Sequence, residues 1–136
     1  RDPIALLDFY KRLGFRTIHE EEFRAGKYPL FAIQIGENAK LNFHGPTLWQ
    51  DPGFAARGPT AQPGCGDLCF VFDGTIDEAV ALIRNAGTEI AYGPIDQPGG
   101  ADRGRREGTS VYTRDPDGNL IEFMTYPAAG RGGWNR

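Results

Sequence analysis

The stretch Arg114-Asp-Pro-Asp-Gly-Asn-Leu-Ile-Glu-Phe123 joins a turn to a strand within one short segment. Asp, Pro and Gly in succession favour a tight turn at Asp115–Gly118, and the residues that follow, Leu120–Tyr126, have the composition of a strand. Side chains of a strand alternate between its two faces. One face takes Ile121 and Phe123, and the opposite face takes Leu120, Glu122 and Met124. We therefore expect a helix to cover the first face and Glu122 to point away from it.

The residues before this stretch predict the rest of a small module. Thr75-Ile-Asp-Glu78 fits a capping box, so a helix is expected to begin there, and Gly87 is a suitable residue to end it. The remaining pattern predicts strands at Cys65–Phe72, Thr88–Tyr92 and Thr109–Arg114, with a loop at Gly93–Gly108. Together with the strand that contains Glu122, the order of this half is β-α-β-β-β.

The first half repeats this order from its helix onward. Asp2 is a good N-cap and Pro3 suits the first helical position, whereas Gly14 ends the helix as a C′ glycine. Strands are expected at Phe15–Glu22, Tyr28–Ile35 and Lys40–His44. The strand that opens the second half has no counterpart here, so a strand is expected to be missing from the front of the first half.

These elements predict an α+β fold. One helix over a small sheet buries little apolar area, so two such modules are expected to share one core. The chain then divides into a first βαβββ module lacking its first strand at 1–44, a linker at 45–64, a second βαβββ module at 65–127 and a tail at 128–136. The linker is assigned because prolines and glycines interrupt any periodicity there.

The composition excludes several classes of partner. The chain has 136 residues, of which 40% are hydrophobic, and a net charge of −3, so it has no positive field that would attract nucleic acid. Its longest apolar runs, such as Leu68–Phe72, are far too short to span a bilayer. Cys65 and Cys69 would lie about 13 Å apart on one strand, too far for a disulfide. Free thiols favour a reducing compartment, and we expect the cytoplasm.

Alternation also sorts the other strands into two faces. The candidate site residues fall on the face away from the helix, and they are Asn42, His44, Asp67, Cys69, Ser110, Tyr112, Glu122 and Met124. The loop at Gly93–Gly108 holds Arg103, Arg105 and Arg106. This loop is either a solvated flap or a lid whose arginines clamp an anionic substrate.

Three stretches resemble the vicinal oxygen chelate superfamily, which includes glyoxalases, bleomycin-resistance proteins and extradiol dioxygenases. Asp8-Phe-Tyr-Lys-Arg-Leu-Gly-Phe15 is similar to the helix exit that opens many of these modules, and Arg114–Phe123 is similar to the turn and strand that close them. Asp67-Leu-Cys-Phe70 stands where the second module often reads H-x-x-F. The resemblance implies paired βαβββ modules that form a curved mixed sheet around a cavity, a small-molecule ligand and a homodimer.

The resemblance implies three functions. The one that we favour is a glyoxalase-like lyase or isomerase acting on vicinal oxygens, in which Glu122 is a ligand or general base. A divalent ion, Zn, Ni, Mn or Fe, would be held by Glu122, by a residue of the missing first strand, and by His44 or Asp67. The alternative is a metal-free protein that sequesters a flat compound, as bleomycin-resistance proteins do. Its ligand-binding residues would be Asn42, Cys69, Ser110, Tyr112, Met124 and, from the loop, Arg105.

Two positions depart from the family pattern. Asp67 stands where the second module often has a histidine, and Asn42 stands where glyoxalase-like members have a carboxylate. An extradiol dioxygenase would need two histidines and one carboxylate on Fe(II). Only His44 is near such a position, so this chemistry is the third candidate.

Overall fold

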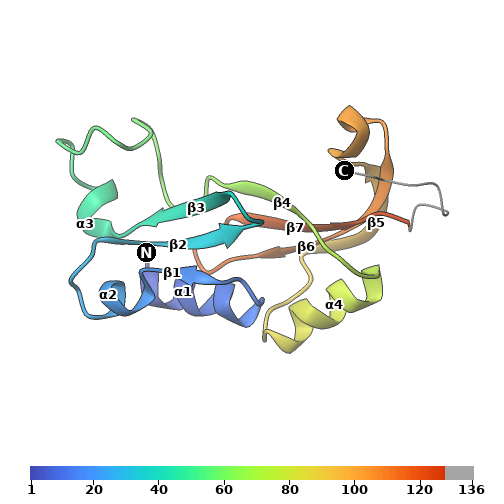
Figure 1. The fold of residues 1–136 in the computed structure, drawn as a ribbon, viewed down its shortest axis with the longest axis horizontal. Helices are drawn as coiled ribbons and strands as arrows, with labels where there is room; N and C mark the ends of the chain where they lie inside the picture. The colour runs from blue at the N-terminus through green and yellow to red at the C-terminus, as the bar shows by residue number, and fades with distance from the viewer. Residues whose placement is uncertain (128–136) are drawn as a thin grey trace. The chain divides into compact units, whose positions relative to one another are not determined.

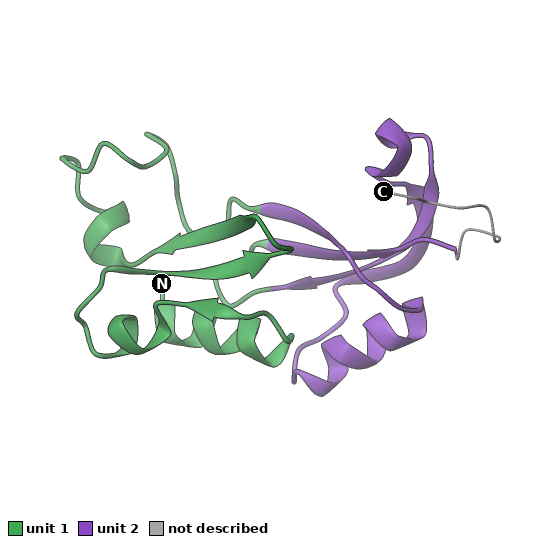
Figure 2. Cartoon of the chain, in the orientation of Figure 1, with its two compact units in different colours: residues 1–66, 115–119 green, residues 67–114, 120–136 purple. Residues whose placement is uncertain are grey.

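A computed structural model describes residues 1–127 of the chain. The tail predicted at 128–136 lies outside the described residues. The described residues form two compact units (Figure 2): unit 1 comprises Arg1–Gly66 with Asp115–Asn119, and unit 2 comprises Asp67–Arg114 with residues 120–127. Both units combine helices with a small sheet (Figure 1), which confirms the α+β class. Within the described part, no helix is long and apolar enough to cross a membrane.

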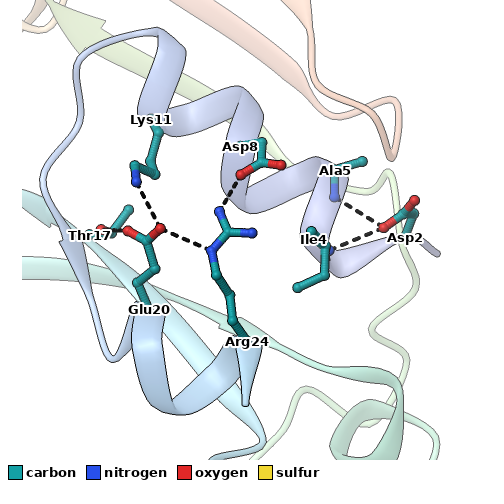
Figure 3. Close-up of polar contacts among 8 residues, drawn as sticks. All are labelled: Asp2, Ile4, Ala5, Asp8, Lys11, Thr17, Glu20 and Arg24. Carbon is teal, nitrogen blue, oxygen red and sulfur yellow. Dashed lines mark hydrogen bonds and ion pairs between the residues drawn. The ribbon is translucent and has the colours of Figure 1, made fainter. Parts of the chain in front are cut away.

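Unit 1 is a three-stranded antiparallel sheet with three helices. Its elements are α1 (Pro3–Arg12), β1 (Thr17–Ile18), α2 (Glu20–Arg24), β2 (Leu30–Ile35), β3 (Ala39–His44) and α3 (Pro46–Trp49), and the strand order is β1-β2-β3. The core is aromatic, because Tyr10 of α1 and Phe31 of β2 are fully buried and both rings contact Phe43. The helix α1 begins where the sequence predicts, since the Asp2 carboxylate accepts hydrogen bonds from the backbone of Ile4 and Ala5 (Figure 3).

A polar network joins α1 to α2 on the surface of unit 1 (Figure 3). Glu20 accepts hydrogen bonds from Lys11 at 2.7 Å, from Thr17 at 2.7 Å and from Arg24 at 3.0 Å. Arg24 also pairs with Asp8. The hydrogen bond from Lys11, followed by that from Thr17, lowers the pKa of Glu20 from 4.5 to about 2. The carboxylate therefore stays charged through most of the acid range.

The strand predicted at Phe15–Glu22 is wrong over its second half. The strand β1 contains only Thr17 and Ile18, and α2 begins at Glu20. His19 adopts a left-handed backbone with φ of 62°, which ends the strand and turns the chain. Three successive glutamates fit the first turn of a helix, where the helix dipole favours negative charge, better than they fit a strand.

Unit 2 has the predicted βαβββ order. Its elements are β4 (Asp67–Val71), α4 (Ile76–Asn85), β5 (Tyr92–Pro98), a 3₁₀ helix η1 (Ala101–Gly104), β6 (Glu107–Arg114) and β7 (Leu120–Thr125). The strand order is β4-β7-β6-β5, with β4 parallel to β7 and the other pairs antiparallel. The capping box of Thr75 and Glu78 is present at the start of α4. On this helix Ile83 is fully buried, as are Val111 and Ile121 of the neighbouring strands.

Two segments predicted as irregular contain some regular structure. The strand expected at Thr88–Tyr92 begins only at Tyr92 and continues to Pro98, inside the predicted loop. Gly93, Pro94 and Pro98 favour a loop by composition, but β5 is an edge strand with a register shift between Tyr92 and Ile95. An edge strand tolerates proline because one side of its backbone needs no partner. The predicted linker at 45–64 contains α3 and lies within unit 1.

The turn between β6 and β7 is held by the side chain of Asp115. Asp115 accepts hydrogen bonds from the backbone of Asp117 at 3.0 Å and of Asn119 at 2.9 Å, and from the Asn119 amide at 2.7 Å. The buried hydroxyl of Tyr10 donates to the same carboxylate at 3.0 Å. Asn119 in turn accepts from the backbone of Gly66 at 2.7 Å. The turn residues 115–119 are therefore bonded to α1 and to the end of the 45–66 segment.

Candidate functional site

One row of side chains crosses the sheet of unit 2 on the face opposite α4. In the strand register Cys69 of β4 is opposite Glu122 of β7, Glu122 is opposite Tyr112 of β6, and Tyr112 is opposite Tyr92 of β5. Residues directly opposite each other in neighbouring strands point to the same face. Ile121, one residue before Glu122, is fully buried on the side of α4. The alternation predicted for β7 is therefore observed.

Glu122 is the centre of a hydrogen-bond network that we call the Glu122 network, formed by Glu122, Ser110, Gln97, Tyr112 and Cys69. Its oxygen Oε1 accepts from the Ser110 hydroxyl at 2.5 Å and from the Gln97 amide nitrogen at 2.8 Å. That amide nitrogen also lies 2.5 Å from the Tyr112 hydroxyl and 3.3 Å from the Ser110 hydroxyl. Glu122 is only 9% exposed and Ser110 is fully buried. The carboxylate is thus held by neutral donors.

The network also changes the acidity of two neighbours. Burial, and then the negative charge of Glu122, raise the pKa of the Cys69 thiol from 9.0 to about 12. Burial is likewise the largest cause of the raised pKa of Tyr112. Among the ion pairs of residues 1–127, none includes Glu122. Cys69 and Tyr112 therefore remain protonated near neutral pH and serve as hydrogen-bond donors rather than as nucleophiles.

The predicted site residues fall into two sets, one in each unit. Five of them share the face described above in unit 2, and these are Glu122, Cys69, Ser110, Tyr112 and Met124. Asp67 lies two residues before Cys69 on β4 and is exposed. Arg105 is exposed and pairs with Asp102 at 2.8 Å, so its observed partner lies within its own loop.

Asn42 and His44 belong to unit 1, on β3. Both line an open hollow of about 560 Å³ that also includes Trp49 and Phe43. The His44 ring contacts Phe54 edge-on, with a centroid distance of 5.4 Å. The structure thus places both residues at one hollow of unit 1.

A divalent metal centre needs several ligands of suitable type. Structural and catalytic sites of this kind use at least three protein ligands, drawn from His, Cys, Asp and Glu. Among residues 1–127, no group of three such side chains that could hold an ion is found, and the set Glu122, His44 and Asp67 stays a prediction. The groups that donate to Glu122 are a hydroxyl and an amide, both neutral, and we assign no chemical step to a metal.

Gln97 is the member of the network that sequence reasoning missed. It lies in the segment predicted as a loop, where Pro94 and Pro98 conceal the strand. The alternation of Ile95 and Gln97 with exposed Asp96 is the only local sign of a strand. Even with β5 assigned, no pattern in the sequence indicates that Gln97 reaches Glu122, which is 25 residues away in the chain.

Comparisons with known proteins agree with the fold. Residues 1–123 match the family described as the Glyoxalase/Bleomycin resistance protein/Dioxygenase superfamily. The chain is 35% identical over 126 residues to Virulence protein STM3117 of Salmonella typhimurium, covering 92% of this chain and 77% of that protein. It is 32% identical over 123 residues to the glyoxalase domain-containing protein RDO1 of Mycosarcoma maydis, covering 90% of this chain and 61% of RDO1. The chain therefore spans less than two thirds of RDO1.

Two solved structures have a similar fold. The crystal structure of Virulence protein STM3117 has a TM-score of 0.74 at 32% identity and covers 93% of this chain and 89% of that chain. The integron cassette protein VCH_CASS1 from V. cholerae has a TM-score of 0.70 at 31% identity, covering 93% and 88%. The chain belongs to the glyoxalase, bleomycin-resistance protein and dioxygenase superfamily, which confirms the resemblance found in its motifs.

Proposed function

We propose that this chain is a glyoxalase-like enzyme that acts on a small substrate with vicinal oxygen atoms, and that Glu122 is the carboxylate of its reaction. The observation that carries the proposal is the fixed position of Glu122, which is 9% exposed and whose Oε1 accepts a hydrogen bond from the fully buried Ser110. A catalytic base must be oriented before the substrate arrives, because reorganisation during the reaction raises the barrier. The family assignment supports the reaction class.

The proposed step is a proton transfer within the substrate. Glu122 removes a proton from the hydroxyl-bearing carbon beside a carbonyl group; the electron pair of that C–H bond forms the C=C bond, and the carbonyl π pair moves to the carbonyl oxygen, giving an enediolate. The same carboxyl group then returns the proton to the former carbonyl carbon. The proton of the original hydroxyl group passes to the former carbonyl oxygen by exchange with water as the new carbonyl forms, so the product is an isomer and no oxidant or reductant is consumed. Tyr112 has a raised pKa and keeps its hydroxyl proton, with which it would donate a hydrogen bond to a substrate oxygen.

Turnover by a pair of glutamate variants tests this role. Hemithioacetals of 2-oxoaldehydes and small 2-hydroxyketones would be incubated with wild type, Glu122→Gln and Glu107→Gln, and isomer formation would be followed by proton NMR. Glu107 is an exposed glutamate at the start of β6 and is the matched control. Loss of a general base reduces rate by about 10²–10⁴-fold, so we expect that loss only in Glu122→Gln. Equal rates in all three proteins would refute the role.

Metal dependence is a separate part of the proposal and has its own test. Elemental analysis of the purified protein would measure Zn, Ni, Mn and Fe for wild type and Glu122→Gln. One equivalent of metal that is lost in Glu122→Gln would add an ion to the mechanism. We also propose that the protein is a homodimer, and light scattering on the same preparations would measure its oligomeric state. The cellular location that we propose is the cytoplasm.

A metal-free binding protein is the second candidate. The observation that favours it is the aromatic surface beside Glu122, where Tyr92 is 58% exposed and its ring lies 5.8 Å from that of Tyr112. Such a surface buries a flat compound by stacking. A compound that raises the melting temperature equally in wild type and Glu122→Gln, without being converted, would favour this function over the enzyme.

A further inference from the structure

The amide nitrogen of Gln97 occupies a position that resembles that of a bound cation. It lies within 3.3 Å of three oxygen atoms, those of Glu122, Tyr112 and Ser110. An amide nitrogen has only two hydrogens to donate, so three oxygen neighbours exceed its capacity. A carboxylate oxygen accepts hydrogen bonds, which explains why Gln97 presents its nitrogen rather than its oxygen. The chain therefore satisfies the carboxylate with its own side chain.

The two side chains that donate to Glu122 Oε1 differ in how easily each can move away from that oxygen. Ser110 is fully buried on β6, which is paired on both sides, by β5 and by β7. Gln97 is half-buried and extends from β5, the edge strand of the sheet. Its register partner on β6 is Gly108, which has no side chain to hold it in place. A long, half-buried side chain on an edge strand can rotate toward solvent, whereas the Ser110 hydroxyl is fully buried beside Glu122.

We propose that Gln97 is a specificity-determining residue, because its amide competes with incoming ligands for Glu122. A ligand reaches Oε1 only if it brings a cation or a hydrogen-bond donor that displaces the amide. Neutral groups without a donor, and anions, have no means to do so. This inference rests on the proposed function, which places a ligand at Glu122. It adds that Gln97 is the residue that selects the ligand.

Binding of Mn²⁺, used as a simple cation, tests the competition. Mn²⁺ prefers oxygen ligands and has little affinity for thiols, so Cys65 and Cys69 interfere little. Electron paramagnetic resonance would measure free Mn²⁺ in titrations of wild type, Gln97→Leu, the double variant Gln97→Leu/Glu122→Gln, and Gln50→Leu. The last is the same change at an exposed glutamine in unit 1. A hydrogen bond to a charged acceptor is strong enough that its removal changes affinity by roughly tenfold or more.

We expect Gln97→Leu to bind Mn²⁺ at least about tenfold more tightly than wild type, which is the change that a freed carboxylate predicts. The gain should disappear in the double variant and be absent in Gln50→Leu. Equal or weaker binding by Gln97→Leu overturns the proposal, since a weaker affinity would make Gln97 a ligand rather than a competitor. A gain that persists without Glu122, or undetectable binding by both wild type and Gln97→Leu, overturns it as well.

A measurement on the wild-type protein guards against a misfolded variant. Zn²⁺ is diamagnetic, so the side-chain amide signals of Gln97, assigned through their loss in Gln97→Asn, can be followed by NMR as Zn²⁺ is added. Displacement moves them to the shifts of a solvated glutamine, and the movement is absent in Glu122→Gln. Signals that stay in place while Zn²⁺ binds at Glu122 contradict the competition. Neither measurement depends on turnover, so the enzymatic proposal can fail while this inference stands.

Discussion

Replacing Tyr10 by Phe should lower the stability of unit 1 by about 2 kcal/mol. Tyr10 is fully buried and its hydroxyl donates to Asp115 at 3.0 Å. The substitution keeps the ring and its contacts with Phe9 and Phe43, so the packing term changes little. What is lost is one hydrogen bond to a charged acceptor, worth about 1.5–3 kcal/mol when the acceptor is buried. Asp115 is 5% exposed, so water replaces the lost donor poorly.

Urea unfolding at pH 7, followed by far-ultraviolet circular dichroism, would measure this loss. Tyr28→Phe is the matched control, because Tyr28 is 41% exposed, and it should change the free energy of unfolding by less than about 0.5 kcal/mol. Combining Tyr10→Phe with Asp115→Asn should cost less than the sum of the two single changes, because both remove the same interaction. If Tyr10→Phe were as stable as Tyr28→Phe, the buried hydrogen bond would not stabilise the fold.

The same pair predicts a dependence on alkaline pH. Burial, and then the charge of Asp115, raise the pKa of the Tyr10 hydroxyl above its ordinary value of 10.0. The folded state therefore holds a proton that the unfolded state releases at pH 10. This contribution is fully present below pH 10 and is lost as the pH rises further. Wild type should lose stability above pH 10 more steeply than Tyr10→Phe, and parallel curves would refute the assignment.

Three further predictions follow from single contacts. Glu20→Gln should lower the free energy of unfolding by at most about 1 kcal/mol, as for surface ion pairs. The pKa of Glu20 is about 2 in the folded state and 4.5 ordinarily. The difference between variant and wild type should therefore be present above pH 4.5 and vanish as the pH falls toward 2. Because the pKa of Cys69 is about 12, little of its thiol is ionised at pH 8. A thiol-reactive dye should therefore label Cys69 far more slowly than Cys65, and mass spectrometry would measure the two rates. Gly99→Ala should destabilise by about 1–3 kcal/mol in urea, since a methyl group would lie 2.0 Å from the Met124 sulfur.

Each of these has a neighbouring control. Glu21→Gln changes an exposed glutamate of the same helix and should leave the acid profile unchanged; a similar effect of both variants would remove the special role of Glu20. Gly100→Ala adds a methyl group that meets nothing within 4 Å, so a cost equal to that of Gly99→Ala would refute the steric argument. Equal labelling of both cysteines would show that burial and Glu122 do not suppress the thiolate of Cys69.

Local patterns in the sequence predicted much of the fold. The capping box at Thr75 sets the start of α4, and the alternation of Ile121 and Glu122 sets the two faces of β7, because both effects act over a few residues. The closing motif at Arg114–Phe123 led to the family that the comparisons confirm. These signals are local, so a single sequence is enough to find them.

Contacts that depend on distant residues could not be predicted in this way. Tyr10 and Asp115 are 105 residues apart in the chain, and the sequence around either residue does not indicate that the two form a hydrogen bond. Gln97 lies on a strand whose prolines favour the prediction of a loop, and its contact with Glu122 depends on the order of strands in the sheet. The expected grouping of His44 and Asp67 with Glu122 came from the family pattern and stays a prediction, since His44 belongs to unit 1 and the other two residues belong to unit 2.

The position of residues 115–119 has a consequence for dissecting this protein. Because they belong to unit 1 while the strands on either side belong to unit 2, neither unit is one continuous piece of the polypeptide. A fragment ending at Gly66 would keep the helix and sheet of unit 1 yet bury the Tyr10 hydroxyl without its acceptor. Splitting the gene at the boundary between the two repeats should therefore destabilise the N-terminal half, and domain-swapping experiments would have to carry residues 1–66 and 115–119 together.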